Sequence, residues 1–235
     1  MGKRLGSITK DIPKCLVPVK GKPLLFNSLD ILSKTKRIKD VFIVVGYKAD
    51  LVQKTIGDEY EGMRIHYVYN ELYSTTNNVY SLAKVKNLIT SDCLLLECDL
   101  YYTQSLIDNI IDKTDDCDIV VSKFNPQTMN GTVILSDSDN NAKQLVIKKH
   151  QGEGFDYSSA WKTVNIYKFK QLFFNNRLIP AIWEYVRSGN LQNYYELVLG
   201  SLIYYRDNNI KIVPVDEKSW YEIDDKNDLK IANNA

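Results

Sequence analysis

Strand-length apolar runs alternate with helix-like segments in the first half of this chain, and that alternation limits the folds open to it. Two runs are almost continuous, Asp40–Val45 (DVFIVV) and Cys93–Cys98 (CLLLEC), and Arg64–Tyr69 alternates as a strand does. The intervening and following segments fit helices, at Leu51–Ile56, Asn78–Leu88 and Leu106–Ile111. Apolar strands separated by helices indicate a parallel sheet covered on both faces. The pattern therefore predicts an α/β protein.

The pattern changes after a further apolar run, Asp118–Phe124 (DIVVSKF). Short strand-like segments with polar turns between them follow, at Thr132–Leu135, Lys143–Ile147 and Thr163–Tyr167. Such spacing is typical of antiparallel strands, so we expect a small antiparallel insertion at about residues 125–167.

The last third of the chain returns to the first pattern. Phe173–Tyr205 is mostly helical and aromatic, and strands return at Ile210–Val215 and Trp220–Asp224. No linker and no internal repeat interrupts the sequence. We therefore expect one Rossmann-like domain over residues 1–235, with a mixed, mostly parallel central sheet flanked by helices.

Charge and hydropathy exclude several classes of partner. The formal net charge is +1, which argues against binding nucleic acid through a broad basic face. No apolar run approaches membrane-spanning length, and the start lacks the apolar region of a signal peptide. We expect a cytoplasmic protein with neither a membrane nor a nucleic-acid partner.

The cysteines and histidines do not assemble into a familiar centre. The cysteines are scattered without paired metal-ligand spacing, at positions Cys15, Cys93, Cys98 and Cys117. This distribution predicts reduced thiols and no zinc site. His66 and His150 stand alone, so neither a serine triad nor a histidine metal cage is expected.

The N-terminal segment, GKRLGSITKDIPKCLVPVKGKPLL, has the composition of a loop wrapped around a polyphosphate. Gly2 lets backbone N–H groups approach phosphate oxygens, and Arg4 and Lys14 supply countercharge. A basic, solvated N-terminus is the simpler alternative. The ordered run of Arg4, Pro13-Lys14 and Gly21-Lys22-Pro23 favours the phosphate loop.

Three carboxylates are candidate ligands for a cation beside such a loop. Asp99 follows the CLLLEC strand, and ligands of parallel sheets bind beyond the carboxyl ends of the strands. Glu222 and Asp224 are two residues apart in a predicted strand and so share a face. Mg²⁺ prefers hard oxygen ligands and takes one or two carboxylates plus substrate phosphates. The alternative for Asp99 is a cap for the next helix.

These features together resemble the nucleotidyltransferases that act on sugar phosphates and phospho-alcohols. That family has a G-x-G-x-R-L loop followed by P-K, a metal aspartate after a central strand, and a late E-x-D. The resemblance implies a Rossmann-like nucleotidyltransferase fold and in-line attack of an acceptor oxygen on the α-phosphorus of a nucleoside triphosphate. It implies catalytic roles for Arg4, Lys14, Asp99 and Asp224, and a Mg²⁺ site at Asp99, Glu222 and Asp224. On the nucleotide side it places Gly2, Lys3, Arg4, Lys14 and Gly46.

A second motif narrows the resemblance. Asn70-x-x-Tyr73 and Thr76-Asn77-Asn78-x-Tyr80-Ser81-Leu82 resemble the cytidylyltransferase branch that acts on small amino-alcohol phosphates and phosphonates. Phosphocholine and 2-aminoethylphosphonate cytidylyltransferases belong to that branch. The resemblance puts Asn78 and Ser81 on the nucleotide side, with CTP as the nucleotide. The alternative is that the asparagines cap the helix that follows.

The acceptor side is expected at the segment Lys162-Thr163-Val164-Asn165-Ile166-Tyr167, which resembles the aminoethylphosphonate members. The resemblance directs Lys162 to the phosphonate and places Asn165 beside it; an exposed lysine on an amphipathic strand is the alternative. The 16 tyrosines and 3 tryptophans are too abundant to identify an aromatic cage for choline. The segment Met129-Asn130-Gly131-Thr132 has no tryptophan where the resemblance implies an aromatic residue in the phosphocholine enzymes. We therefore expect 2-aminoethylphosphonate as the acceptor, with phosphocholine, or a nucleotide-binding domain without catalysis, as alternatives.

The start of the chain departs from the family. The family's loop follows a buried apolar strand, whereas here Met1 occupies the middle position of the G-x-G. We expect an unpaired strand edge beside Asp40–Val45 or Cys93–Cys98, and a gain in stability and CTP affinity when an apolar strand is added upstream. The resemblance also implies a phosphonate-pathway enzyme as a fused or associated partner.

Overall fold

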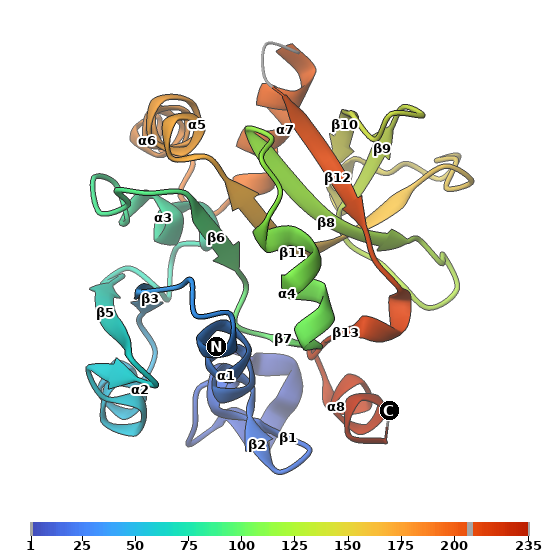
Figure 1. Ribbon diagram of the computed structural model, residues 1–235. Coiled ribbons are helices and arrows are strands. Elements are labelled where there is room, and N and C mark those ends of the chain that lie inside the picture. Colours follow the sequence, from blue (N-terminus) through green and yellow to red (C-terminus); the bar gives the residue numbers. More distant parts are fainter. Residues whose placement is uncertain (1, 206–208, 235) are drawn as a thin grey trace. The chain divides into compact units, whose positions relative to one another are not determined.

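The alternating strands and helices form a mixed α/β structure, which a computed structural model describes for residues 2–205 and 209–234 (Figure 1). The expected fold class, a mixed central sheet with flanking helices, is confirmed. The chain forms two units, each built from several stretches. Unit 1 comprises Met1–Ser74, Glu97–Asp108 and Lys218–Ala235, and unit 2 comprises Thr75–Leu96 and Asn109–Glu217. That one domain spans residues 1–235 stays a prediction.

Unit 1 contains a three-stranded sheet in the order β3-β5-β4. β3 (Asp40–Val45) and β5 (Met63–Tyr69) are parallel, and β4 (Glu59–Tyr60) pairs with β5 antiparallel. Helix α2 (Ala49–Ile56) joins β3 to β4. β3, β5 and α2 lie within two residues of the bounds expected from the sequence, and β4 was not expected.

The rest of unit 1 brings the N-terminal segment to the C-terminal one. The N-terminal elements are two 3-10 helices, η1 (Lys3–Thr9) and η2 (Lys14–Leu16), followed by β1 (Pro18–Val19), β2 (Lys22–Pro23) and α1 (Leu24–Lys34). The later elements are β7 (Leu100–Tyr102), η5 (Glu217–Ser219), β13 (Trp220–Glu222) and α8 (Lys226–Asn234), with α4 (Gln104–Ile111) continuing into unit 2. β7 and β13 pair antiparallel, with Leu100 opposite Glu222.

An apolar cluster holds these segments together. Its buried members come from the N-terminal segment, α1 and the C-terminal segment: Leu5, Val17, Val19, Leu24, Ile223 and Ala232. Leu5, Val17 and Ile223 are completely buried. Burying an aliphatic side chain contributes about 1.5–3 kcal/mol relative to leaving it exposed. The cluster therefore fixes the N-terminal loop against the segment that carries Glu222 and Asp224.

Unit 2 is built on a mixed sheet in the order β10-β9-β11-β8-β12, with β6 also paired to β11. Its strands are β6 (Cys93–Leu96), β8 (Cys117–Lys123), β9 (Val133–Ser136), β10 (Ala142–Val146), β11 (Trp161–Phe169) and β12 (Ile210–Pro214). Its helices are α3 (Asn78–Ala83), η3 (Lys148–His150), α5 (Gln171–Phe173), η4 (Phe174–Leu178), α6 (Ile179–Arg187) and α7 (Tyr195–Tyr205). The helix expected at residues 78–88 ends at Ala83. Beyond it, the N–H groups of Val85, Lys86 and Leu88 bond to carbonyls three residues back, not four, and Asn87 adopts a positive φ of 68°.

Parallel pairing is less frequent than the helix-separated runs led us to expect. Between described strands it occurs at β3–β5 and at β8–β12, and the other pairings are antiparallel. The reason is β11, which runs antiparallel between neighbours on both sides. β9 and β10 form the antiparallel hairpin expected for the insertion, with a small apolar core of Phe124, Val133, Val146 and Ala160.

β3 and β6 each pair on one side within the described residues, β3 with β5 and β6 with β11. Although both are apolar, β6 is half-buried throughout, and in β3 Val45 is buried while the other five residues are half-buried. An unpaired edge was expected beside one or the other of these two segments, and it stays a prediction.

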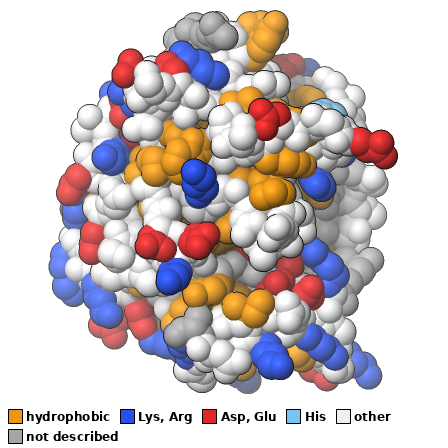
Figure 2. Space-filling model, turned by 90° about the vertical axis from the view of Figure 1, so that its right-hand side faces the viewer, with side chains coloured by type: hydrophobic (Ala, Val, Ile, Leu, Met, Phe, Trp, Pro, Cys, Tyr) orange, Lys and Arg blue, Asp and Glu red, His pale blue; other side chains and the backbone are white. Residues whose placement is uncertain are grey.

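The surface charge and the apolar character of the helices bear on two kinds of partner that the sequence argues against, nucleic acid and a membrane. The face in Figure 2 intersperses lysine and arginine with aspartate and glutamate and has no continuous basic area. Within the described residues, no helix combines the length and the apolar character needed to cross a membrane.

Candidate functional site

The N-terminal loop takes a shape that its first glycine permits. Gly2 has a φ of 64°, a left-handed conformation that side chains disfavour. A Cβ there would lie 3.1 Å from Thr9 Cγ2 and 3.3 Å from Lys14 Cβ, so space is short as well. The Gly2 carbonyl accepts hydrogen bonds from the Leu5 N–H (3.0 Å) and the Thr9 hydroxyl (2.8 Å). The loop thus closes tightly and places Lys14 at its end.

Lys14 connects two carboxylates that are far apart in the sequence. Its Nζ donates to Asp99 Oδ2 at 2.7 Å and to Asp224 Oδ1 at 2.8 Å. The Lys14 side chain is 14% exposed, so these contacts are largely shielded from water. All three residues belong to unit 1. One ammonium therefore joins the N-terminal loop, the residue after the CLLLEC run and the C-terminal segment.

Arg4 adds a second cation to the same cluster. Its Nη2 lies 2.8 Å from Asp224 Oδ2, while its own side chain is 67% exposed. Asp224 thus binds Lys14 through one oxygen and Arg4 through the other. Lys3 lies in η1, and its side chain is outside what the structure describes.

Backbone pairing brings the carboxylates together. The Ile223 N–H donates to the Asp99 carbonyl at 2.9 Å, next to the Leu100–Glu222 pair. Asp224 lies beyond β13, which ends at Glu222, so the expected sharing of one strand face does not describe this pair. One oxygen from each of Asp99, Glu222 and Asp224 nevertheless lies within 4.8 Å of the others.

The charges perturb two ionisable groups in a mutually supporting way. Burial alone would lower the pKa of Lys14, but the Asp99 and Asp224 carboxylates more than offset burial and raise it well above its ordinary value. Burial alone would raise the pKa of Asp224, but hydrogen bonding and attraction from Lys14, with attraction from Arg4, lower it. Both groups are therefore held in their charged forms across the neutral range.

The residues present fit a hard divalent cation. Asp99 Oδ1 is buried and has no hydrogen-bond partner within the described residues, so one oxygen in the cluster remains available as a ligand. The cluster offers carboxylate oxygens alone, which suits Mg²⁺ better than softer metals. A cation held by Asp99, Glu222 and Asp224 would replace the neutralising charge that Lys14 now supplies.

Lys22 and Gly46 lie outside this cluster although both are in unit 1. Lys22 pairs with Asp30 of helix α1 and leaves the carboxylates to Lys14. Gly46 follows β3 and is covered by Tyr73: a Cβ at Gly46 would lie 2.4 Å from Tyr73 Cβ. The glycine there is required by a neighbouring side chain of the protein, and its predicted role beside the nucleotide stays a prediction.

Asn78 and Ser81 belong to unit 2, at the start and in the middle of α3. Asn77 caps that helix, since its Oδ1 accepts from the Asn78 N–H at 2.8 Å. Asn78 Oδ1 accepts from the Tyr195 N–H at 3.0 Å and so fixes the start of α7. The capping alternative thus describes Asn77. A nucleotide role for Asn78 and Ser81 stays a prediction.

Lys162 and Asn165 lie on β11 in unit 2 and are both buried, with 4% and 7% exposure. The alternative of an exposed lysine on an amphipathic strand is therefore wrong. Asn165 has a φ of 60°, and the β11–β8 register shifts between Thr163 and Tyr167. A bulge of this kind redirects side chains and bends the strand. A Cβ on Gly131, which has a φ of 106°, would lie 2.9 Å from Lys162 Nζ.

Sequence reasoning missed several contributors to these two regions. Asp225 and Asp228 cap α8 and fix Asp224: Asp228 Oδ2 accepts from the Asp224 N–H (2.9 Å) and the Asp225 N–H (3.0 Å). The D-x-x-D spacing before a helix was the available signal, because it resembles a capping box. The space that Gly131 leaves for Lys162 had no sequence signal.

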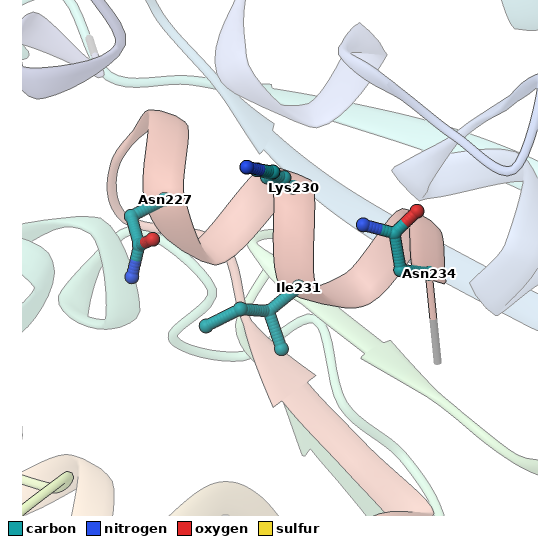
Figure 3. A pocket seen from close by; sticks show the side chains of 4 residues that line it. All are labelled: Asn227, Lys230, Ile231 and Asn234. Carbon is teal, nitrogen blue, oxygen red and sulfur yellow. The ribbon is translucent and has the colours of Figure 1, made fainter.

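A surface hollow elsewhere in unit 1 contains none of the predicted site residues. Figure 3 shows its lining on one face of α8, by Asn227, Lys230, Ile231 and Asn234. It is open to solvent and has no carboxylate in its lining. It therefore contributes nothing to the cluster of Arg4, Lys14 and the carboxylates.

Comparison with known proteins adds independent evidence. The family model described as the MobA-like NTP transferase domain matches residues 1–195. The CMP-5'-(3-aminopropyl)phosphonate synthase of Streptomyces rubellomurinus is 30% identical over 233 residues, which are 99% of this chain and 37% of that protein. The chain thus spans little more than a third of the length of that relative.

Two further similarities concern cytidylyltransferases. The choline-phosphate cytidylyltransferase of Streptococcus pneumoniae is 25% identical over 215 residues, covering 88% of this chain and 90% of that one. The solved structure of the CTP:phosphocholine cytidylyltransferase from Streptococcus pneumoniae superimposes with a TM-score of 0.77 at 21% identity, over 99% of this chain and 93% of that one. The inositol-1-phosphate CTP transferase from T. maritima gives a TM-score of 0.72 at 20% identity, covering 98% and 89%. The structural matches establish the fold.

Proposed function

Because the chain belongs to the family of MobA-like NTP transferase domains and is a nucleotidyltransferase, we propose that it transfers CMP from CTP to a small aminoalkyl phosphonate. The observation that carries the chemistry is the charge cluster of Arg4, Lys14, Asp99 and Asp224. It combines cations suited to a triphosphate with carboxylates suited to a divalent cation.

The reaction joins an acceptor oxygen to the α-phosphorus of CTP and breaks the bond from that phosphorus to the bridging oxygen, so pyrophosphate leaves. The second ionisation of a phosphate group lies near pH 6, so the acceptor oxygen is already anionic at neutral pH. No side chain has to remove a proton. The protein's task is positioning and neutralisation of charge.

Arg4 and Lys14 are the groups that would neutralise the triphosphate. Lys14 stays charged because its pKa is raised, and its ammonium can exchange Asp99 or Asp224 for a phosphate oxygen. A bound Mg²⁺ would supply Lewis acidity at the α-phosphate, with Asp99, Glu222 and Asp224 as its ligands. Asp224 stays ionised as a ligand because its pKa is lowered.

The acceptor is proposed to be 2-aminoethylphosphonate or a close aminoalkyl homologue. The support is the 30% identity over 99% of the chain with a relative whose name specifies an aminopropyl phosphonate. On the acceptor side we place Lys162, as the cation for the phosphonate, and Asn165. Gly2, Lys3, Gly46, Asn78 and Ser81 are proposed to lie on the nucleotide side.

A second candidate is transfer to phosphocholine. It is supported by the similarity to the choline-phosphate cytidylyltransferase of Streptococcus pneumoniae, because the match covers 90% of the length of that protein. A nucleotide-binding domain without turnover is the candidate from another class. The three candidate functions differ in whether pyrophosphate is released from CTP and in which acceptor supports that release.

The deciding experiment measures pyrophosphate release from CTP with each acceptor in turn. We expect release with 2-aminoethylphosphonate or 3-aminopropylphosphonate, dependent on Mg²⁺ and abolished by EDTA. The Asp224→Asn variant is the matched control, because it keeps the side-chain shape and loses the charge. Preferential use of phosphocholine would overturn the acceptor assignment, and CTP binding without any release would overturn the enzymatic one.

A further inference from the structure

Two cysteine side chains meet beside the Lys14–Asp99 ion pair. Cys15 follows Lys14 in η2, and Cys98 precedes Asp99. The Cys15 and Cys98 side chains lie close enough to each other to interact. The neighbouring Lys14 Nζ–Asp99 Oδ2 contact of 2.7 Å brings the same two chain segments together independently. The thiols and the ion pair all belong to unit 1, and nothing in the proposed transfer uses the thiols.

The two thiols differ in exposure in a way that favours oxidation as a pair. Both are free, Cys98 is exposed, and Cys15 is 9% exposed. An oxidant from solvent can therefore approach the chain at Cys98, whereas Cys15 is protected from competing reactions. The remaining cysteines, Cys93 and Cys117, are in unit 2 and serve as internal comparisons.

We propose that Cys15 and Cys98 are an oxidative modification site: they form a reversible disulfide that locks the adjacent charge cluster. The existence of the disulfide is independent of the proposed function, whereas its effect on turnover rests on that function. The pair joins two segments that are 83 positions apart in the sequence but adjacent at the site.

The chemistry needs a peroxide as oxidant and balances without a cofactor. One sulfur attacks a peroxide oxygen to give a sulfenic acid, and the other sulfur then displaces that oxygen as water. The two thiols lose two electrons and two protons, and hydrogen peroxide becomes two waters. Two side chains that already interact need only a local adjustment to bring their sulfurs to the S–S length of about 2.05 Å. A dithiol reductant reverses the step by thiol–disulfide exchange.

The disulfide would hold Lys14 and Asp99 together through their neighbours. In the proposed reaction Lys14 exchanges a carboxylate for a phosphate oxygen, which would leave Asp99 free to hold a bound cation. A covalent link between residues 15 and 98 restricts the separation that both events require. We therefore expect the oxidised protein to bind neither CTP–Mg²⁺ nor Mn²⁺ as tightly as the reduced protein does.

The first experiment locates the bond without using activity. The reduced full chain is treated with hydrogen peroxide, the remaining thiols are alkylated, and the protein is digested and analysed by mass spectrometry. We expect a linked peptide pair containing Cys15 and Cys98, with Cys93 and Cys117 alkylated. The same treatment of Cys93→Ala should give the same pair. If the wild-type sample consumes peroxide but its digest contains no linked Cys15–Cys98 peptide pair, the proposal is overturned.

The second experiment measures the consequence. Mn²⁺ binding, followed by electron paramagnetic resonance, and CTP-dependent pyrophosphate release are recorded before oxidation, after oxidation and after dithiothreitol. We expect both to fall on oxidation and to recover on reduction in wild type and Cys93→Ala, but to stay unchanged in Cys98→Ala. Thermal unfolding of Cys98→Ala identifies a folding defect, in which case Cys15→Ala takes its place.

The outcomes separate the two ideas. If the reduced protein releases no pyrophosphate with any acceptor, the proposed function fails, and the linked peptide with Mn²⁺ binding still decides the modification site. If the linked protein binds Mn²⁺ and turns over as the reduced protein does, the lock is refuted and the proposed function stands.

Discussion

The charge cluster of unit 1 and the Lys162 region of unit 2 both hold a shielded lysine, but they hold it by different means. Lys14 is fixed by two carboxylates that come from positions 99 and 224, so its place depends on ion pairs between distant segments. Lys162 is placed by the backbone of one strand, with the Asn165 bulge nearby and the space left by Gly131 beside its ammonium.

This difference indicates how each region should respond to change. An ion-pair cluster is sensitive to charge and tolerant of small changes in shape, because Coulomb attraction varies gradually with distance. A lysine positioned by a bulge and a glycine is sensitive to an added methyl group, because packed interiors do not yield easily. Charge substitutions and size substitutions therefore test the two regions separately.

The largest effect is expected from Asp224→Asn and Asp99→Asn. Each amide keeps the shape of the carboxylate but loses the charge required of a cation ligand, so turnover should fall by about a hundredfold or more. The fold should stay intact, which circular dichroism would check. Wild-type turnover at saturating Mg²⁺ in either variant would contradict the placement of the cation.

A smaller loss is expected from Lys14→Ala, about 2–4 kcal/mol of transition-state stabilisation from a preorganised charged donor. Lys22→Ala is the matched control, because Lys22 is paired with Asp30 and not with the cluster. Values of kcat/KM for CTP measure both variants. Equal, small losses for the two lysines would mean that the resemblance of Pro13-Lys14 to the family loop is accidental.

On the unit 2 side, Lys162→Ala should raise the KM for the phosphonate by about tenfold or more, with little change in the KM for CTP. The reason is the loss of a charge-assisted contact to an anionic group. Steady-state kinetics with each substrate varied in turn make the measurement. A rise in the KM for CTP instead would place Lys162 beside the triphosphate.

Gly131→Ala tests whether shape holds Lys162. Its methyl group would lie 2.9 Å from Lys162 Nζ, and the φ of 106° disfavours any side chain, so the lysine must move or the turn must shift. We expect a KM for the phosphonate a few times that of wild type. Gly152→Ala is the control, since a Cβ there meets nothing within 4 Å. Identical kinetics in both variants would show that Gly131 does not position the lysine.

The smallest effect concerns stability and pH in unit 1. The lowered pKa of Asp224 contributes stability above its unfolded value of about 3.9, and this contribution is lost as pH falls through the folded pKa. The raised pKa of Lys14 contributes stability below about 10.4, and this contribution is lost as pH rises through its folded pKa. Urea unfolding should show a constant gap between wild type and Lys14→Met from pH 5 to pH 9 and a narrower gap at pH 3.

A gap that changed steadily between pH 5 and pH 9 would contradict this account, because neither group titrates there. Lys162→Met serves as the comparison from the other unit. Its own difference from wild type should not follow the titration of Asp224.

Local patterns in the sequence were sufficient for the elements and for the residues of the charge cluster. Apolar runs such as Asp40–Val45 predicted strands to within a residue or two, because burial imposes a period that a short window reveals. The order of Arg4, Lys14, Asp99, Glu222 and Asp224 predicted side chains that the structure brings together, and their role in binding a phosphate and a cation stays a prediction.

Tertiary structure alone decided how those residues meet. The sequence could not show that β11 pairs with β6 and β8 as well as with β9, that Asp224 leaves its strand, or that Asn165 adopts a left-handed conformation inside one. Nor could it show that Cys15 and Cys98 lie close enough to interact or that Gly131 makes room for Lys162. The physical reason is that such contacts join residues distant in the chain. They depend on which surfaces pack together, and a local pattern carries no information about a partner that lies dozens of residues away.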